Sequence, residues 1–191
     1  MAYAIYITDA LVCGTFNRNT ADCSYLLFTR EAGMLYADAR SVREEKSRQR
    51  YALQDFSLVR VSLVKGKQTW RIGSIEAVDN YYRRADSKQA RGGVVSVFRL
   101  LRRFVKGEEA SAELFDFVLA GLKVLKTENS NQFVAEVVQL RIMAHLGYVD
   151  SKQIPEVIRR VNPEELIRLD SKEVSLVVDK LYAQAVESSH L

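Results

Sequence analysis

Apolar and polar residues alternate in short runs along the first eighty residues. These runs are rich in β-branched and aromatic side chains and are separated by polar or glycine-containing turns, a pattern typical of short antiparallel strands. In one run Val59, Val61 and Leu63 share a face, while Arg60 and Ser62 lie on the other. The predicted strands span residues 3–13, 24–29, 34–42, 56–64 and 68–78. Five such strands predict a five-stranded antiparallel barrel of the OB-fold type.

The connections between these strands differ in character. Asn17–Thr20 is a polar turn, and Lys65-Gly66-Lys67 is a tight hairpin. Residues 43–50 contain no apolar side chain, so a strand is excluded there and an exposed, mobile loop is predicted.

The apolar period becomes helical from about Gly93 onward. Glycines at 107 and 147 are placed to end helices, and Asn162-Pro163 is typical of a helix start. We therefore predict an α+β protein of two domains, with Gly92-Gly93 in a linker. The predicted boundaries are 1–80 for the OB-fold nucleic-acid-binding domain, 81–92 for the linker and 93–191 for an all-α helical domain.

Composition narrows the class of protein. Of the 191 residues 48% are hydrophobic, enough for a packed core, and charges interrupt every apolar stretch. The two cysteines, Cys13 and Cys23, fit small buried strand residues in a reducing compartment. These features predict a cytoplasmic, soluble protein with no membrane partner.

Motifs of catalysis are missing from the sequence. It has no phosphate-binding G-x-x-x-x-G-K-[ST] loop, no G-x-S-x-G elbow and no H-E-x-x-H pair. His145 is the one histidine away from the C-terminal end, and packing at a helix end explains it. We expect no enzyme, no cofactor and no metal site.

Charge divides unevenly along the chain. Residues 1–93 carry 15 Lys/Arg and 10 Asp/Glu, whereas residues 94–191 carry 13 and 14, so the halves have net charges of +5 and −1. Because cations that neutralise phosphates release counterions, a basic barrel favours nucleic-acid binding. The predicted nucleic-acid-binding residues are Arg40, Arg43, Lys46, Arg48, Arg50, Lys65, Lys67, Trp70 and Arg71.

Aromatic residues of the barrel offer a second kind of contact. Trp70 and Tyr36 are candidates for stacking on bases. Core packing is an equal alternative for Trp70, and a solvated surface turn softened by Glu44 and Glu45 is the alternative for the basic loop.

The order and spacing of several motifs resemble the RecO family of recombination mediators. The similarity covers roughly residues 10 to 150 and is strongest at residues 27–35 (LFTREAGML). It continues through 52–57 (ALQDFS), the Lys65-Gly66 hairpin, 75–77 (IEA), 114–117 (LFDF) and 143–148 (MAHLGY). The resemblance implies an OB domain followed by a helical domain. It also implies binding to single- and double-stranded DNA, strand annealing, and work with RecR and single-stranded DNA-binding protein in loading RecA. The localisation that the resemblance implies is a bacterial cytoplasm, in association with the nucleoid.

The sequence departs from the family at several places. Residues 149–152 stand where many members insert a four-cysteine zinc finger, so no zinc is expected. The family's Lys-Gly-Ala-Arg turn appears as Asp38-Ala39-Arg40, and Asn131 and Gln132 replace basic residues of some relatives. The sequence also stops short of the family's last helix, so we expect a divergent, short member with a reduced set of partners.

Two functions follow from these patterns. The first is a non-enzymatic DNA-binding and single-strand annealing protein that acts as a recombination mediator in DNA repair. The alternative is a protein–protein interaction adaptor with only incidental DNA affinity, favoured by the net charge of only +4 and by Glu44 and Glu45 in the basic loop.

Overall fold

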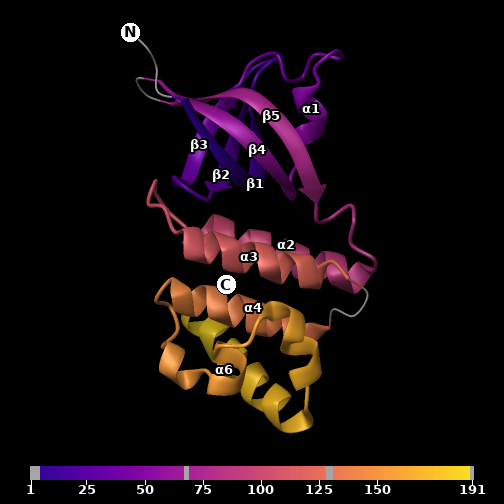
Figure 1. Cartoon of the computed structure of the whole chain (residues 1–191), viewed down its shortest axis with the longest axis vertical. Coiled ribbons are helices and arrows are strands. Elements are labelled where there is room, and N and C mark those ends of the chain that lie inside the picture. The colour runs from indigo at the N-terminus through magenta and orange to yellow at the C-terminus, as the bar shows by residue number, and fades with distance from the viewer. Residues whose placement is uncertain (1–4, 67–68, 128–130, 190–191) are drawn as a thin grey trace. The chain divides into compact units, whose positions relative to one another are not determined.

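The computed structural model of the chain describes residues 5–66, 69–127 and 131–189. The first part is built of five strands and one helical turn, α1 (Gln49–Ala52), and Figure 1 shows them from indigo to magenta. The strands are β1 (Ile5–Asn17), β2 (Cys23–Thr29), β3 (Gly33–Ala39), β4 (Ser57–Lys65) and β5 (Trp70–Asn80). The prediction of five strands is confirmed, although the third ends at Ala39 instead of residue 42.

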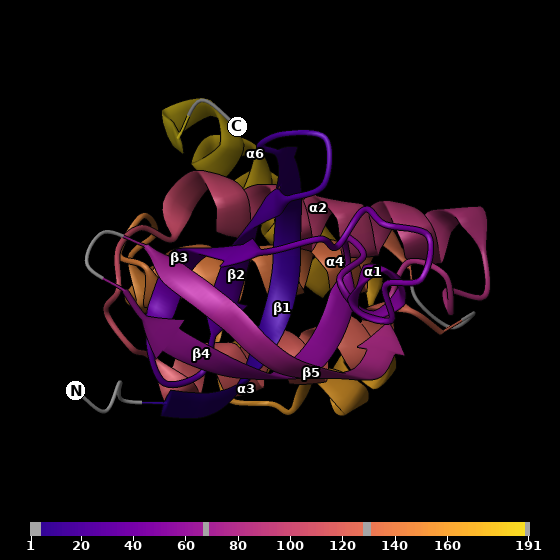
Figure 2. The ribbon, with the colours of Figure 1, turned by 90° about the horizontal axis from the view of Figure 1, so that it is seen from above.

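The five strands form a closed barrel in the order β1-β2-β3-β5-β4, with β4 pairing back to β1, and Figure 2 views these strands from above. The prediction that every pair is antiparallel is wrong at one place, because β3 and β5 run parallel. A ring of five strands cannot alternate in direction all the way round, so one parallel pair is required. That pair is short: its register joins Ala37 to Trp70 and Asp38 to Arg71.

The barrel interior is filled by one side of each strand. Val59, Val61 and Leu63 are buried there as predicted, and Leu27 and Leu35 pack with them. Both cysteines are buried and free, in accordance with their predicted role as small core residues.

The segment after β3 is only partly the loop that the sequence predicted. Residues 43–46 are exposed, but Val42 is buried in the core and α1 follows at Gln49. The Gln49 Nε2 donates to the carbonyl oxygen of Gly73 at 2.8 Å, which fixes α1 beside β5 (Figure 2).

Helices make up the rest of the described chain. They are α2 (Lys88–Phe104), α3 (Ala112–Leu125), α4 (Gln132–His145), α5 (Glu156–Arg159) and α6 (Lys172–Ser189), with 3₁₀ turns at Ser151–Gln153 and Pro163–Leu169. Gly107 and Gly147 have φ of 79° and 80° and follow α2 and α4, as predicted for glycines that end helices. The interpretation of Gly92-Gly93 as linker is wrong, because both residues lie inside α2, which begins at Lys88.

The chain separates into two compact units. Leu101–Phe115 belong with the described residues of Met1–Tyr81, and Tyr82–Leu100 belong with those of Asp116–Leu191. Within the first unit, the rings of Phe28 and Phe115 pack with centroids 5.3 Å apart, and the Met34 amide donates to the Gly107 carbonyl oxygen at 2.9 Å. The end of α2 and the start of α3 are therefore part of the barrel unit. None of the helices described is long and apolar enough to cross a membrane.

Candidate nucleic-acid interface

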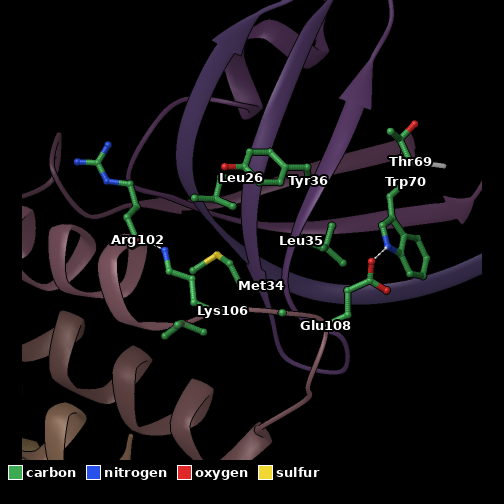
Figure 3. Close-up of a pocket in the computed structure, with 11 residues that line it drawn as sticks. Leu26, Met34, Leu35, Tyr36, Thr69, Trp70, Arg102, Lys106 and Glu108 are labelled. Atoms are coloured by element: carbon green, nitrogen blue, oxygen red, sulfur yellow. Dashed lines mark hydrogen bonds between the residues drawn. The ribbon is translucent and has the colours of Figure 1, made fainter. Parts of the chain in front are cut away.

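Two hollows share Thr69 in their lining, one on the face of β2 and β3 and the other where the β1–β2 connection, the end of β3 and the start of β5 come together. In barrels of this type, this face and the β1–β2 and β4–β5 connections are where oligonucleotides bind. The first hollow, here called the Tyr36 hollow, has a volume of about 400 Å³. Its lining includes Leu26, Met34, Tyr36, Thr69, Trp70, Arg102, Lys106 and Glu108 (Figure 3). The second, the Arg40 hollow, has a volume of about 480 Å³ and is lined by Arg18, Asp22, Asp38, Ala39, Arg40, Gln49, Thr69, Arg71 and Ile72.

The Tyr36 hollow has an exposed aromatic pair at its edge. Tyr36 is 54% exposed, and its ring packs against Phe16, which is 47% exposed, with the centroids 5.8 Å apart. Aromatic rings with open faces on a barrel surface are typical platforms for unpaired bases.

Cations line the same hollow from the end of α2. Arg102 lies on its last turn, and Lys106 follows the helix and donates from Nζ to the Arg102 carbonyl oxygen at 3.0 Å. Figure 3 shows the Arg102 guanidinium pointing away from Trp70, on the opposite side of the labelled residues. The hollow therefore combines an apolar floor with positive charge at its edge.

The Arg40 hollow brings together cations from three parts of the chain. Arg18 comes from the β1–β2 connection, Arg40 follows β3, and Arg71 lies at the start of β5. Arg18 is paired with Asp38 at 2.6 Å, and Asp22 is the second acid of the lining. Three cations against two acids leave a small positive excess.

Hydrogen bonds tie the β1–β2 connection to the chain after β3. Asn19 Nδ2 and the Ser41 amide donate to the Asp22 carboxylate, and these bonds, the one from Asn19 first, hold its pKa below the usual range. Arg43 donates from its guanidinium to the Asn19 carbonyl oxygen at 2.8 Å. The backbone that carries Arg18 and Arg40 is thus held as one structure.

The predicted residues are only partly brought together. Arg40 and Arg71 line the Arg40 hollow, while Arg43 supports its wall through the bond to Asn19. Lys46, Arg48 and Arg50 are exposed but line neither hollow. Lys67 lies outside the described residues.

Trp70 and Lys65 both donate hydrogen bonds to Glu108, a residue that the sequence analysis did not select. Trp70 is only 6% exposed and belongs to the barrel core, so core packing describes its ring better than base stacking does. Its Nε1 donates to Glu108 Oε1 at 2.9 Å (dashed in Figure 3), and Lys65 Nζ lies 2.9 Å from Glu108 Oε2. These two bonds, the one from Lys65 first, lower the pKa of the Glu108 carboxyl.

Sequence reasoning missed several residues of this face. Arg18 lies in the β1–β2 turn and Phe16 near the end of β1, and the polar turn signal could have drawn attention to both. Arg102 and Lys106 carry no such signal, because basic residues off the apolar stripe of a helix are ordinary surface residues. Within residues 5–66, 69–127 and 131–189, no cluster of three His, Cys, Asp or Glu side chains is placed to hold a metal ion.

The protein is thus of the OB-barrel class: its five strands form a closed barrel, with Tyr36 exposed on β3 and with cations from the β1–β2 connection, the start of β5 and the end of α2 around two hollows. Comparison with known proteins gives the family. Residues 1–81 match the family described as recombination protein O, N terminal, and residues 91–149 match recombination protein O, C terminal. The chain belongs to the RecO family.

Individual relatives agree with this assignment. The chain is 27% identical over 144 residues to the DNA repair protein RecO of Pelotomaculum thermopropionicum, covering 75% of this chain and 56% of the relative. It is 27% identical over 143 residues to that of Myxococcus xanthus, covering 74% and 59%. It is 35% identical over 78 residues to that of Symbiobacterium thermophilum, covering 41% and 31%. The chain thus spans just over half the length of the first two relatives.

Proposed function

We propose that this protein acts in DNA repair as a non-enzymatic DNA-binding and strand-annealing protein, a recombination mediator. The observation that supports it best is the convergence of Arg18, Arg40 and Arg71, together with Arg102 and Lys106, on two adjoining hollows beside an exposed aromatic pair. The relatives are named DNA repair proteins, which agrees with this function. Its DNA partners would be single and double strands.

Annealing needs no catalytic group under this proposal. Cations on the barrel screen the repulsion between two phosphate backbones and so lower the cost of their encounter. The basic segment that holds Arg43, Lys46, Arg48 and Arg50 would extend the screening surface beyond the hollows. RecR and single-stranded DNA-binding protein are the proposed protein partners.

A salt series with single-stranded DNA tests this function. Replacing Arg43, Lys46, Arg48 and Arg50 with alanine should weaken binding about 25- to 130-fold at about 0.1 M salt, because about two or three phosphate contacts are lost. The measurements are fluorescence anisotropy of a labelled oligonucleotide and the annealing rate of complementary strands.

The outcomes separate the alternatives. Unchanged affinity in the four-residue variant would remove this segment from the interface. Millimolar DNA affinity in the unsubstituted protein, with nuclease-resistant capture of a protein partner, would favour the adaptor instead.

A pair of substitutions at Tyr36 tests stacking. Tyr36→Ala should weaken binding of single strands by about 1–3 kcal/mol, because one base loses its aromatic partner. Tyr36→Phe keeps the ring and should bind like the unsubstituted protein. Equal losses in both variants would show that the hydroxyl, and not the ring, makes the contact.

A further inference from the structure

Lys65 and Trp70 form a ready pair of donors at one end of the Tyr36 hollow. The two residues are direct partners in the β4–β5 ladder, so their side chains lie next to each other on the same face of the two strands. The Lys65 ammonium lies 5.0 Å from the centroid of the Trp70 ring. One ammonium and one indole N–H therefore point into the same small region.

That region is filled by a single carboxylate from elsewhere in the chain. Glu108 places one oxygen 2.9 Å from Lys65 Nζ and the other 2.9 Å from Trp70 Nε1. A carboxylate that takes a separate donor on each oxygen occupies the site as two oxygens of a phosphodiester would. The side chains of Lys65 and Glu108 are 58% and 45% exposed, so a competing anion can reach them from solvent.

The backbone around Glu108 is fixed while its side chain is not enclosed. The Gly107 carbonyl oxygen accepts from the Met34 amide at 2.9 Å, and Gly33 packs closely against the backbone of Glu109. Rotation of the Glu108 side chain alone would therefore empty the site, without moving β3 or the end of α2.

We propose that Lys65 and Trp70 form a phosphate-binding subsite of the DNA interface, and that Glu108 occupies it in the free protein as an internal competitor of DNA. The inference rests on the proposed function and adds to it a regulatory contact. DNA must displace the Glu108 carboxylate to use Lys65, so binding of short strands is weaker than the cations on the face would otherwise allow. DNA strands that also bind in the adjoining Tyr36 hollow are the ones that displace the Glu108 carboxylate.

Glu108→Gln tests the competition directly. The amide oxygen can still accept from Trp70, but the charge that holds Lys65 is gone. One released cation should tighten binding of a labelled oligothymidine about five-fold at about 0.1 M salt and steepen the slope of log K against log salt by about 0.7. Glu109→Gln makes the same charge change one residue away and should alter affinity less than about two-fold. Lys65→Ala in the Glu108→Gln background should abolish the gain.

Trp70 supplies a second readout, because it is the only tryptophan of the chain. Unlabelled oligothymidine should change the Trp70 emission of the unsubstituted protein, and much less so that of Lys65→Ala. Inorganic phosphate at equal ionic strength should leave the emission unchanged, and an equal change with phosphate alone would overturn the assignment to DNA. Far-UV circular dichroism verifies the fold of each variant.

The results distinguish this inference from the function on which it rests. If the unsubstituted protein binds DNA and Glu108→Gln binds no better, or Glu109→Gln gains as much, the subsite is wrong and the function stands. If neither protein binds DNA, the proposed function fails and the subsite fails with it.

Discussion

Alanine at Arg40, Arg71, Arg102 and Lys106 together is expected to weaken single-stranded DNA binding by about 10²–10³-fold at about 0.1 M salt. These four cations line the two hollows from three separate places in the sequence: the end of β3, the start of β5 and the end of α2. If each neutralises one phosphate of a single strand, the affinity varies as the salt concentration to the power of about −0.7 for each contact. Four lost contacts then correspond to about 600-fold at 0.1 M salt.

The salt dependence is the sharper measurement, because it counts contacts and does not depend on a single condition. The slope of log K against log salt should become shallower by about 2.8 in the four-residue variant. A matched control removes four exposed cations of the other unit, Lys123, Lys152, Arg168 and Lys172. It makes the same change in net charge and should leave the slope unchanged. Equal losses in both variants would mean that DNA responds to net charge and not to this face.

The second large effect is expected at Gly33, where alanine should destabilise the barrel unit by about 3 kcal/mol. Gly33 has a φ of 65°, and a side chain in this left-handed region costs about 1–2 kcal/mol. A Cβ there would also lie 2.8 Å from the Glu109 amide nitrogen and the Gly107 carbonyl oxygen. The backbone of residues 107–109 must then move, which breaks the hydrogen bond from the Met34 amide at a further cost of about 1 kcal/mol.

Gly107→Ala is the matched control for this prediction. Gly107 also has a positive φ, of 79°, but a Cβ there would meet no described heavy atom within 4 Å. It should therefore show only the conformational cost of about 1–2 kcal/mol. Urea unfolding followed by Trp70 emission reports on the barrel unit for both variants. Equal destabilisation would show that the close approach of residues 107–109 to β3 contributes nothing.

The strands and the barrel core were predictable from sequence because alternation is a local signal. Val59, Val61 and Leu63 reveal a buried face without reference to any other strand. The parallel pairing of β3 with β5 was not predictable in that way, because it follows from closing an odd ring and not from either strand alone.

The lining of the two hollows could be predicted only in part. Arg40 and Arg71 were among the candidates because basic residues concentrate in their stretch of sequence, and Tyr36 was a candidate because it is an aromatic residue of a predicted strand. Glu108 lies 43 residues beyond Lys65, so nothing near Lys65 indicates that its charge is already paired. Charge counting treats each cation as available, whereas the fold decides which of them has an internal partner.

The short parallel ladder between β3 and β5 also affects how stably the barrel is closed. Among the described residues this ladder has two residue pairs, whereas every other pair of neighbouring strands has a longer ladder. The β3–β5 ladder is therefore where the fewest backbone hydrogen bonds hold the barrel closed. The β3 side of this ladder carries Tyr36, Ala39 and Arg40, and the β5 side carries Thr69, Trp70 and Arg71. A DNA strand bound across both hollows would contact both sides of this ladder. Its binding would therefore also stabilise the closed form of the barrel.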